Sequence, residues 1–462
     1  MLGQMYDCAK ATIPLQVAAM NKHHLPDELA AGISRRHFLK RSSLAAASAA
    51  AVVSFPNVLR AQSKLTLNAA IIGVGGRGLG AGKNFLEALK HTGVEGKIVA
   101  VADIFPEQSA KAKTDFGLTD DRAFSGFDAY RKALEVPGVN YAILAAPPGF
   151  RPSHFKACVA AGKHIFTEKP VAVDGPGCAV MYAAAEEAKK KNLKIVAGTQ
   201  RRHSAAYIET VKRIQDGAIG DVLSLRAYWV NGGPIWHRGE KGTTELEVQI
   251  RNWYHYIWLC GDHHVEQHIH NIDVCNWIMG GPPVKAWGMG ARQVLGSKSG
   301  EIWDNFAVEY EYANGVRMHS YCGQIKREWH SVSEAVQGSK GTSNPAGAIQ
   351  VKGGEDWRFA GKGLDPYVQE HIDLIHAIAN DTPVNEGKQV TDTTLTAIMG
   401  REAAYSGQLV DWDSMLNSKY KYGPDAMYAE SATMQWGPHR RLKSPVPNEH
   451  DIFADKPLVA EV

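Results

Sequence analysis

The sequence lacks the cysteine patterns that mark metal-binding or disulfide-rich proteins. None of its six cysteines forms a CxxC pair, so it offers no zinc-ribbon or thioredoxin-like motif. Six cysteines in 462 residues are also too sparse for a disulfide framework, and we expect buried free thiols instead. They are Cys8, Cys158, Cys178, Cys260, Cys275 and Cys322.

A strong excess of one charge is also missing. The formal net charge is +3 at pH 7, which gives no reason to expect nucleic acid or an anionic membrane surface as a partner. The sequence contains no repeat of fixed period and no heptad run. Its hydrophobic fraction of 44% and charged fraction of 21% are typical of globular proteins, and its length allows two ordinary domains with additional segments.

The N-terminal part contains a segment with the features of a targeting signal. Arg35 and Arg36 precede Phe-Leu-Lys at residues 38–40, and an apolar, alanine-rich stretch follows over residues 44–55. This stretch is too short for a stable transmembrane helix, which needs about 20 apolar residues. The order of charge, apolar run and the small residue Ala61 resembles a twin-arginine export signal.

This resemblance implies that residues 1–61 form a signal segment. Such a signal would direct the folded protein to the periplasm or otherwise out of the cytoplasm, with no membrane span left after processing. The alternative interpretation is a short basic loop before a buried helix.

A glycine-rich turn follows the first apolar strand that we expect, over residues 65–72. The turn consists of Gly73, Val74, Gly75, Gly76, Arg77 and Gly78, and a helical pattern follows it. In this strand–turn–helix context, GxGxxG predicts a dinucleotide site. Gly73 would allow the tight turn. Gly75 would let the backbone approach a pyrophosphate, and Gly78 would let the helix pack closely on the strand. Free N–H groups at the helix N-terminus would bind the phosphates. The alternative is a structural glycine turn of another α/β protein.

Two further apolar strands support the dinucleotide interpretation. The strand over residues 97–102 ends at Asp103, where a carboxylate can accept hydrogen bonds from the adenosine ribose. The same carboxylate would repel a 2′-phosphate, so we expect NAD as the cofactor rather than NADP. The strand over residues 140–146 runs into Pro147, which should lie near the cofactor at the carboxyl edge of the sheet.

Two later motifs carry a resemblance to a known family. A strand over residues 163–167 ends in Glu168-Lys169-Pro170. A second segment begins at Glu266 and includes His268, His270 and Asp273. With the GxGxxG domain, these motifs resemble the Gfo/Idh/MocA oxidoreductases from about residue 65 to about residue 415. The segment departs from the family pattern at Glu266, where the family usually has Asp, and at His268, where it usually has Gly.

The resemblance implies an α/β fold of two domains. A Rossmann dinucleotide-binding domain would occupy residues 62–196. A C-terminal α/β domain with a large open, mostly antiparallel sheet would occupy residues 197–420 and support a homo-oligomer, either a dimer or a tetramer. The sequence agrees independently, because residues 306–312 alternate and Asn-Gly at 314–315 indicates a hairpin. Residues 421–462 read as an extended tail that packs on another surface.

The chemistry implied is hydride transfer from a secondary alcohol, which needs a proton acceptor and a cation beside the developing alkoxide. Lys169 can supply the positive charge and, with Glu168, would also contact the cofactor. His270 has a suitable ordinary pKa for proton transfer. Glu266, one helical turn earlier, could orient His270 or contact a substrate hydroxyl.

Four residues are candidate substrate contacts: His268, Arg202, His203 and Tyr254. Arg202 and His203 fit a solvated surface turn equally well, and the aromatic residues around Tyr254 fit an ordinary core. His268 and His270 stand close to Asp262, His263 and His264, which together raise the alternative of a metal site. Their spacing fits no HExxH or similar zinc pattern, so we expect no metal.

The sequence supports two functions. The first is an NAD(P)-dependent oxidoreductase acting on a secondary alcohol of a sugar, glycoside or polyol. The second is a redox-neutral enzyme that retains NAD and cleaves a glycoside by oxidation, elimination and re-reduction. A sugar-binding protein with a decayed cofactor site is disfavoured, because the glycine turn, Lys169 and His270 are intact.

Overall fold

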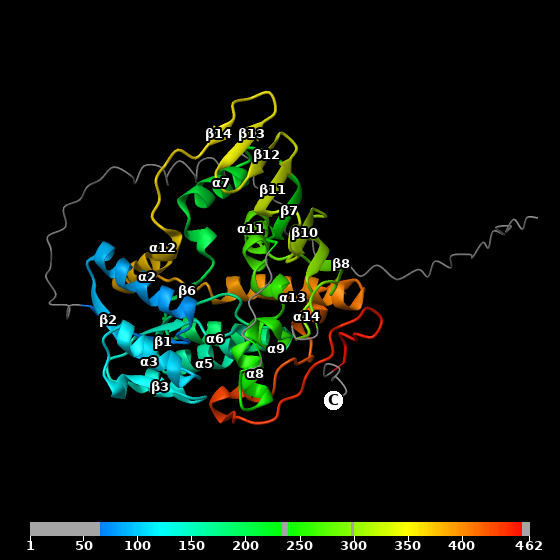
Figure 1. The fold of residues 1–462 in the computed structure, drawn as a ribbon. Coiled ribbons are helices and arrows are strands. Elements are labelled where there is room, and N and C mark those ends of the chain that lie inside the picture. The colour runs from blue at the N-terminus through cyan, green and yellow to red at the C-terminus, as the bar shows by residue number, and fades with distance from the viewer. Residues whose placement is uncertain (1–64, 233–238, 240, 297–299, 455–462) are drawn as a thin grey trace, which may run out of the picture. The chain divides into compact units, whose positions relative to one another are not determined.

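The computed structural model describes residues 65–232, 239, 241–296 and 300–454 (Figure 1). The predicted export segment lies outside the described residues. Those that are described belong to one compact unit. Within them, no helix is both long enough and apolar enough to cross a membrane.

The first domain is built on a six-stranded sheet with the order β3-β2-β1-β4-β5-β6, in which every neighbouring pair is parallel. Its strands are apolar because helices cover both faces of a parallel sheet. The strands are β1 Thr66–Ile72, β2 Glu95–Asp103, β3 Ala123–Ser125, β4 Tyr141–Leu144, β5 His164–Thr167 and β6 Ile195–Ala197. The strand order is that of a Rossmann domain, whose ligands bind at the carboxyl edge of the sheet.

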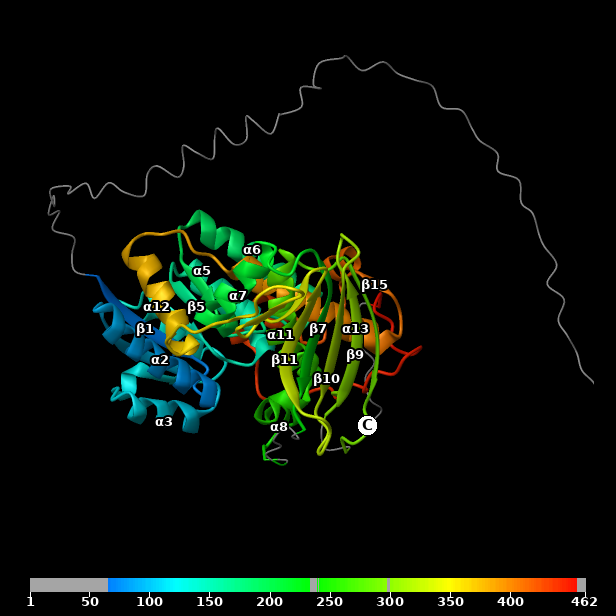
Figure 2. The same ribbon diagram turned by 90° about the horizontal axis from the view of Figure 1, so that it is seen from above.

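Helices of the first domain follow its strands. They are α2 Gly76–Thr92, α3 Pro106–Asp115, α4 Ala129–Glu135, α5 Arg151–Ala160 and α6 Gly175–Lys190, with 3-10 turns η1 Asp120–Arg122 and η2 Pro148–Phe150. A later helix, α12 Pro366–Ala379, packs on α2, as both ribbon views show (Figures 1 and 2). In that contact the His371 ring lies 6.1 Å from the Phe85 ring.

The second domain contains a nine-stranded sheet with the order β14-β13-β12-β11-β7-β10-β9-β8-β15. Only the β7–β10 pair is parallel among the paired strands that the structure describes. The strands are β7 Val222–Val230, β8 Lys285–Ala291, β9 Asn305–Glu311, β10 Arg317–Gly323, β11 Ser331–Gly338, β12 Gly341–Asn344, β13 Ala348–Val351, β14 Trp357–Arg358 and β15 Val410–Asp411. The two sheets confirm the predicted fold class, and the antiparallel β9–β10 pair confirms the predicted hairpin.

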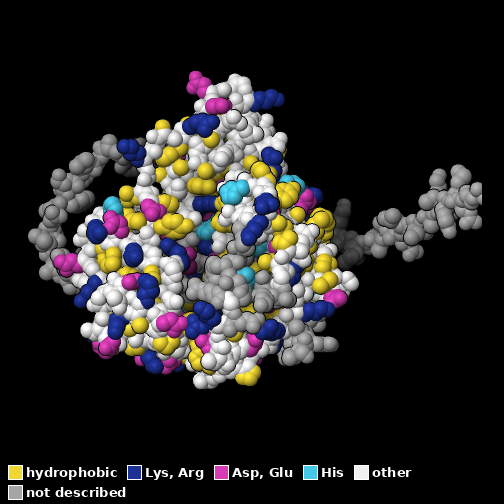
Figure 3. Space-filling view, in the orientation of Figure 1, with side chains coloured by type: hydrophobic (Ala, Val, Ile, Leu, Met, Phe, Trp, Pro, Cys, Tyr) yellow, Lys and Arg dark blue, Asp and Glu magenta, His cyan; other side chains and the backbone are white. Residues whose placement is uncertain are grey.

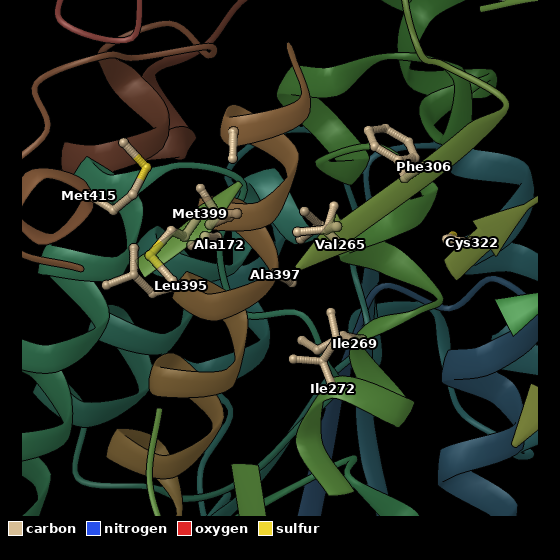
Figure 4. Close-up of a cluster of buried hydrophobic side chains, with 14 of the residues drawn as sticks. Ala172, Val265, Ile269, Ile272, Phe306, Cys322, Leu395, Ala397, Met399 and Met415 are labelled. Carbon is tan, nitrogen blue, oxygen red and sulfur yellow. The ribbon is translucent and has the colours of Figure 1, made fainter. Parts of the chain in front are cut away.

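Two long helices of the second domain, α11 Ile269–Met279 and α13 Gly387–Ser406, cover one face of the nine-stranded sheet (Figure 2). Between them lies an apolar cluster that includes Val265, Ile272 and Phe306 (Figure 4). The remaining helices are α7 Ala205–Gln215, α8 Glu245–Arg251, α9 Ile257–Cys260, α10 His263–Glu266, α14 Trp412–Leu416 and α15 Ala426–Ala429, with 3-10 turns η3 Gln200–His203, η4 Trp253–His255 and η5 Ser431–Thr433.

Over residues 421–454, the described part of the predicted tail, the only helical segments are the short α15 and η5, and most of the chain is irregular. It returns to the first domain, where the Ser431 N–H donates to Ser153 Oγ at 2.9 Å. Charged side chains of both signs are mixed over the face of the molecule seen in Figure 3. This mixed surface agrees with the nearly balanced net charge of the sequence.

Candidate active site

A cleft of about 520 Å³ lies at the carboxyl edge of the six-stranded sheet and is lined by both domains. The first domain contributes the glycine turn, the ends of β2 and β4, and the Glu168-Lys169 pair. The second domain contributes Tyr254, Glu266 and His270. Segments far apart in sequence therefore meet in one cavity.

The glycine turn fits a dinucleotide. Gly73 has a φ of +86°, which favours glycine, and a Cβ on Gly78 would lie 1.8 Å from the Gly73 carbonyl oxygen. Such a Cβ on Gly75 or Gly76 would meet no atom within 4 Å. The side of the turn that faces the cleft is therefore open, whereas the side that faces the strand is closely packed.

Helix α2 begins at this turn. It has 17 residues, its N-cap is Gly75, and its first turn contains no acidic residue. The unpaired N–H groups at its N-terminus carry a partial positive charge, which favours phosphate groups. The turn and the helix together would hold a pyrophosphate.

Asp103 connects the end of β2 to the glycine turn. Its carboxylate accepts hydrogen bonds from the Val74 N–H at 2.9 Å and the Phe105 N–H at 3.0 Å. Burial raises the pKa of Asp103, although these backbone hydrogen bonds oppose the shift. Asp103 also lines the cleft, as does Pro147 after β4. Both are placed where the adenosine half of a dinucleotide lies in a Rossmann domain.

Lys169 and Glu266 join the two domains across the cleft. The Lys169 ammonium donates to the Glu266 carbonyl oxygen at 2.5 Å and lies 3.1 Å from Glu266 Oε1. Their side chains are only 9% and 10% exposed, so water screens this ion pair weakly. Glu266 Oε2 has no hydrogen-bond partner among the described residues, which leaves one acceptor for a ligand.

His270 lies in the first turn of α11 and lines the same cleft. Its ring packs on Trp229 with 5.9 Å between ring centroids. Burial lowers the pKa of His270 well below its usual value, and the charges of Lys169 and Arg201 add to the shift. The imidazole is therefore neutral at pH 7, the form in which a ring nitrogen is available as an acceptor.

Arg77 and Glu168 form an ion pair beside the cleft. Arg77 Nε donates to the Glu168 carboxylate, and the guanidinium lies 4.7 Å from the centroid of the Tyr367 ring. The Arg77 side chain is therefore directed toward Glu168 and α12. Both residues line the cleft, together with Tyr254 of η4.

Three of the four residues predicted from the sequence as substrate contacts do not line the cleft. His268 is fully buried, and its Nε2 lies 2.7 Å from Ser320 Oγ on β10. One residue beyond Gln267, which lines the cleft, the backbone has turned the side chain toward the sheet. His268 is therefore placed to hold α11 against β10.

Arg202 and His203 are engaged in ion pairs behind the cleft. Arg202 Nε donates to Asp273 Oδ2 at 2.8 Å, and His203 Nδ1 lies 2.6 Å from Asp373 Oδ2. Burial alone would lower the pKa of His203, but hydrogen bonds to Asp373 and Glu386 outweigh it and raise the pKa to about 10. Asp273, the last residue of the second motif, serves here to anchor η3.

Of the histidines that suggested a metal site, His263 and His264 are buried, and each bonds a different partner. His263 Nδ1 lies 2.9 Å from Cys322 Sγ, and His264 Nε2 lies 2.9 Å from the Tyr310 hydroxyl. No group of three or more His, Cys, Asp or Glu side chains is arranged to hold a metal ion in the part of the chain that the structure describes. The five described cysteines are buried free thiols.

Arg151 is a buried residue of the site that the sequence did not indicate. It donates to the carbonyl oxygens of Leu144 at 2.6 Å and Glu168 at 2.8 Å, and so ties the ends of β4 and β5 together. Burial lowers its pKa to about 10. An arginine at the start of a helix is ordinarily solvated, so only the three-dimensional structure places it beneath the cleft.

Comparison with known proteins agrees with this architecture. Residues 67–195 match the family model described as "Oxidoreductase family, NAD-binding Rossmann fold", and residues 207–344 match the GFO/IDH/MocA C-terminal domain. Together the two matches cover more than half of the chain.

Relatives and solved structures give the same picture. An inositol 2-dehydrogenase from Ralstonia nicotianae is 29% identical over 55% of this chain and 66% of its own length. That match thus spans just under two thirds of the relative. Another, from Gluconacetobacter diazotrophicus, is 25% identical over 68% of this chain and 87% of its own length.

The fold is similar to that of scyllo-inositol dehydrogenase from Lactobacillus casei, solved with NAD(H) and scyllo-inositol. That structure has a TM-score of 0.59 and 19% identity, and the match covers 76% of this chain and 100% of the other. At this identity, the likeness supports the fold alone. From the two matched domains, we conclude that the chain belongs to the Gfo/Idh/MocA family, with an NAD-binding Rossmann domain followed by the family's C-terminal domain.

Proposed function

We propose that this protein is an NAD-dependent dehydrogenase that oxidises a secondary alcohol of a sugar, glycoside or polyol. The observation that carries the proposal is the meeting of Lys169, Glu266 and His270 in one cleft beside the glycine turn. The names of the relatives, inositol 2-dehydrogenases, support a polyol or a sugar as the substrate class.

The cleft residues have complementary roles in this reaction. Bound NAD supplies the hydride acceptor. Neutral His270 accepts the proton of the substrate hydroxyl, while the Lys169 ammonium stabilises the developing negative charge on its oxygen. Glu266 holds Lys169 in place through Oε1 and offers Oε2 to a neighbouring substrate hydroxyl.

The cofactor preference follows from the adenosine end of the cleft. Asp103 places a carboxylate there, and Arg251, the nearby cation, is engaged by Glu107 at 2.7 Å and Glu247 at 2.8 Å. Among the described residues at this end of the cleft, a 2′-phosphate would meet a carboxylate and no unengaged cation, so we expect NAD to be preferred over NADP. Asp103→Asn keeps an oxygen acceptor for the Val74 N–H of the turn but removes the negative charge. The variant should therefore prefer NAD over NADP less strongly, measured as the ratio of kcat/KM for the two cofactors.

The test uses purified protein and a panel of inositols, hexoses and aryl glycosides. Net formation of NADH with a polyol or sugar supports the dehydrogenase. Release of an aglycone without net NADH would instead indicate the redox-neutral glycoside-cleaving enzyme. Absence of both reactions, with NAD bound, would contradict the proposed substrate class.

We also propose export through the twin-arginine pathway. The arginine pair at residues 35–36 and the apolar stretch after it support this proposal. Replacing both arginines by lysine should leave the uncleaved precursor in the cytoplasm. Normal processing and release of that variant would exclude the pathway.

A homo-oligomer, either a dimer or a tetramer, is the third part of the proposal. The face of the nine-stranded sheet opposite α11 and α13 exposes Trp287 and Met289 of β8 and Tyr321 of β10, the two strands that flank β9. Exposed apolar patches of this kind mark association surfaces. Trp287→Glu together with Met289→Glu should reduce the mass measured by analytical ultracentrifugation to that of a monomer, and an unchanged mass would exclude this surface.

A further inference from the structure

The C-terminal tail contacts the first domain close to the cleft. The Ser431 hydroxyl lies 3.0 Å from the Ser153 hydroxyl on α5, and the Tyr428 hydroxyl donates to the Asp174 carboxylate at 2.5 Å. Asp174 is also the N-cap of α6. These contacts fix residues 428–431 against the first domain.

The same tail then contacts the second domain. Arg441 forms an ion pair with Glu245 of α8 at 2.7 Å, Gln249 donates to the Arg440 carbonyl oxygen at 3.1 Å, and the His439 ring packs 4.6 Å from Trp258. Figure 1 shows this part of the chain in orange-red beside α8. Residues 428–441 therefore bridge the two domains, and they lie beyond the matched family domains, which end at residue 344.

Between these two attachments, the tail packs on aromatic residues beside the adenosine end of the cleft. The Trp436 ring stacks on Phe105 with 5.8 Å between ring centroids and lies 4.8 Å from Phe127. Phe105 follows Asp103 by two residues and lines the cleft. Trp436 thus supports the segment that carries the ribose-binding carboxylate.

A narrow inner cavity of about 60 Å³ continues from the cleft at this point. Its wall includes Ile104 and Phe127 of the first domain, Ile250 of α8 and Ser431 of the tail. It also shares Asp103 and Pro147 with the cleft. The largely apolar wall of this slot offers a contact for the face of an adenine ring held in the adjoining cleft.

We propose that residues 428–441 form a strap that completes the adenine pocket and slows the release of NAD(H). Ser431 contributes to the pocket wall, and Trp436 is a positioning residue that acts through Phe105 and Phe127. This inference rests on the proposed function, because it assigns tail residues to the cofactor site of the same enzyme.

The test measures NADH release from the purified full-length protein. The enzyme is loaded with NADH, mixed rapidly with excess NAD, and the loss of bound-NADH fluorescence is followed. Trp436→Ala should release NADH at least about fivefold faster than wild type, because the ring contacts that hold Phe105 are lost. The KM for NAD should rise as well, because the same contacts hold the oxidised cofactor.

Three further variants make the result specific. Trp436→Phe should restore slow release, because it keeps an aromatic ring against Phe105. Phe453→Ala is the matched control, since Phe453 lies in the same tail with its side chain 70% exposed, and it should release NADH like wild type. Ser153→Ala removes an attachment of the strap without touching Trp436 and should also accelerate release about fivefold.

A folded Trp436→Ala variant that releases NADH at the wild-type rate would overturn the proposal of a strap. If that variant fails to fold, judged by circular dichroism, wild-type release from Ser153→Ala overturns it instead. If the wild-type protein binds NADH and turns over substrate, but the strap variants release NADH at the wild-type rate, only the strap proposal is contradicted. A wild-type protein that binds no NADH contradicts the proposed function as well.

Discussion

At the scale of the residue, burial determines which groups of the cleft can exchange a proton. His270 is neutral at pH 7 because burial and the charges of Lys169 and Arg201 lower its pKa. The Lys169 ammonium remains next to the Glu266 carboxylate in a site that water screens weakly. In the proposed reaction, the neutral imidazole would accept the proton of the alcohol and the ammonium would stabilise the developing alkoxide.

His270→Ala and Lys169→Ala should each lower kcat by about 10²-fold or more, because each removes a positioned group from the transition state. Both variants should still bind NADH, since neither residue belongs to the glycine turn. Steady-state kinetics and NADH titration measure the two effects separately. His268→Asn is the matched control, because His268 lies in the same segment but outside the cleft, and its kcat should remain near that of wild type.

A second residue-scale prediction concerns pH and stability. Burial raises the pKa of Glu301 to about 8, from an ordinary value of 4.5. Between these values the unfolded chain is ionised while the folded protein holds the proton. Rising pH therefore favours unfolding, by about 1.4 kcal/mol per pH unit from this group, and the effect levels off above the folded-state pKa.

Glu301→Gln removes this ionisation while keeping an oxygen acceptor for the Ile257 N–H, now 2.9 Å from Glu301 Oε1. The melting temperature of the variant should increase relative to that of wild type as the pH rises from 5 to 8. Exposed Glu355 provides the control, and Glu355→Gln should follow wild type at both pH values. A difference between Glu301→Gln and wild type that does not change with pH would contradict the assignment.

At the scale of the element, two glycines of the turn serve different purposes: Gly78 allows close packing of the fold, and Gly75 leaves space for the cofactor. A Cβ at position 78 would lie 1.8 Å from a backbone oxygen, whereas one at position 75 would enter open space on the cleft side. Gly78→Ala should therefore destabilise the fold by about 1–3 kcal/mol. Gly75→Ala should melt near wild type but bind NADH more weakly. Calorimetry and NADH titration of the two variants distinguish these effects, and wild-type NADH affinity in Gly75→Ala would contradict the pyrophosphate assignment.

Most elements of the fold could be predicted from the sequence. The buried parallel strands are short apolar runs, and the β9–β10 hairpin has strict alternation with Gly315 at a φ of +82° in the turn. Such signals depend only on neighbouring residues, so they can be recognised in a single sequence. The orientation of His268 could not be predicted, because it depends on how one turn of chain before α11 meets the nine-stranded sheet.

At the scale of the whole molecule, the site is formed by contacts between distant parts of the sequence. Lys169 and Glu266 are 97 residues apart, and Ser153 meets Ser431 across 278 residues. No local pattern encodes these contacts. The family resemblance named Lys169 and Glu266 as site residues, whereas their contact, the attachment of the tail and the burial of Arg151 became evident only from the structure.

The central claim is that the cleft oxidises a secondary alcohol with NAD. The most direct measurement is the nicotinamide absorbance of the purified enzyme with NAD during incubation with inositols and hexoses, compared with Lys169→Ala under the same conditions. We predict substrate-dependent formation of NADH by wild type, reduced by about 10²-fold in the variant. NADH formation that is equal in the two proteins, or absent with every polyol and sugar although NAD is bound, would contradict the claim.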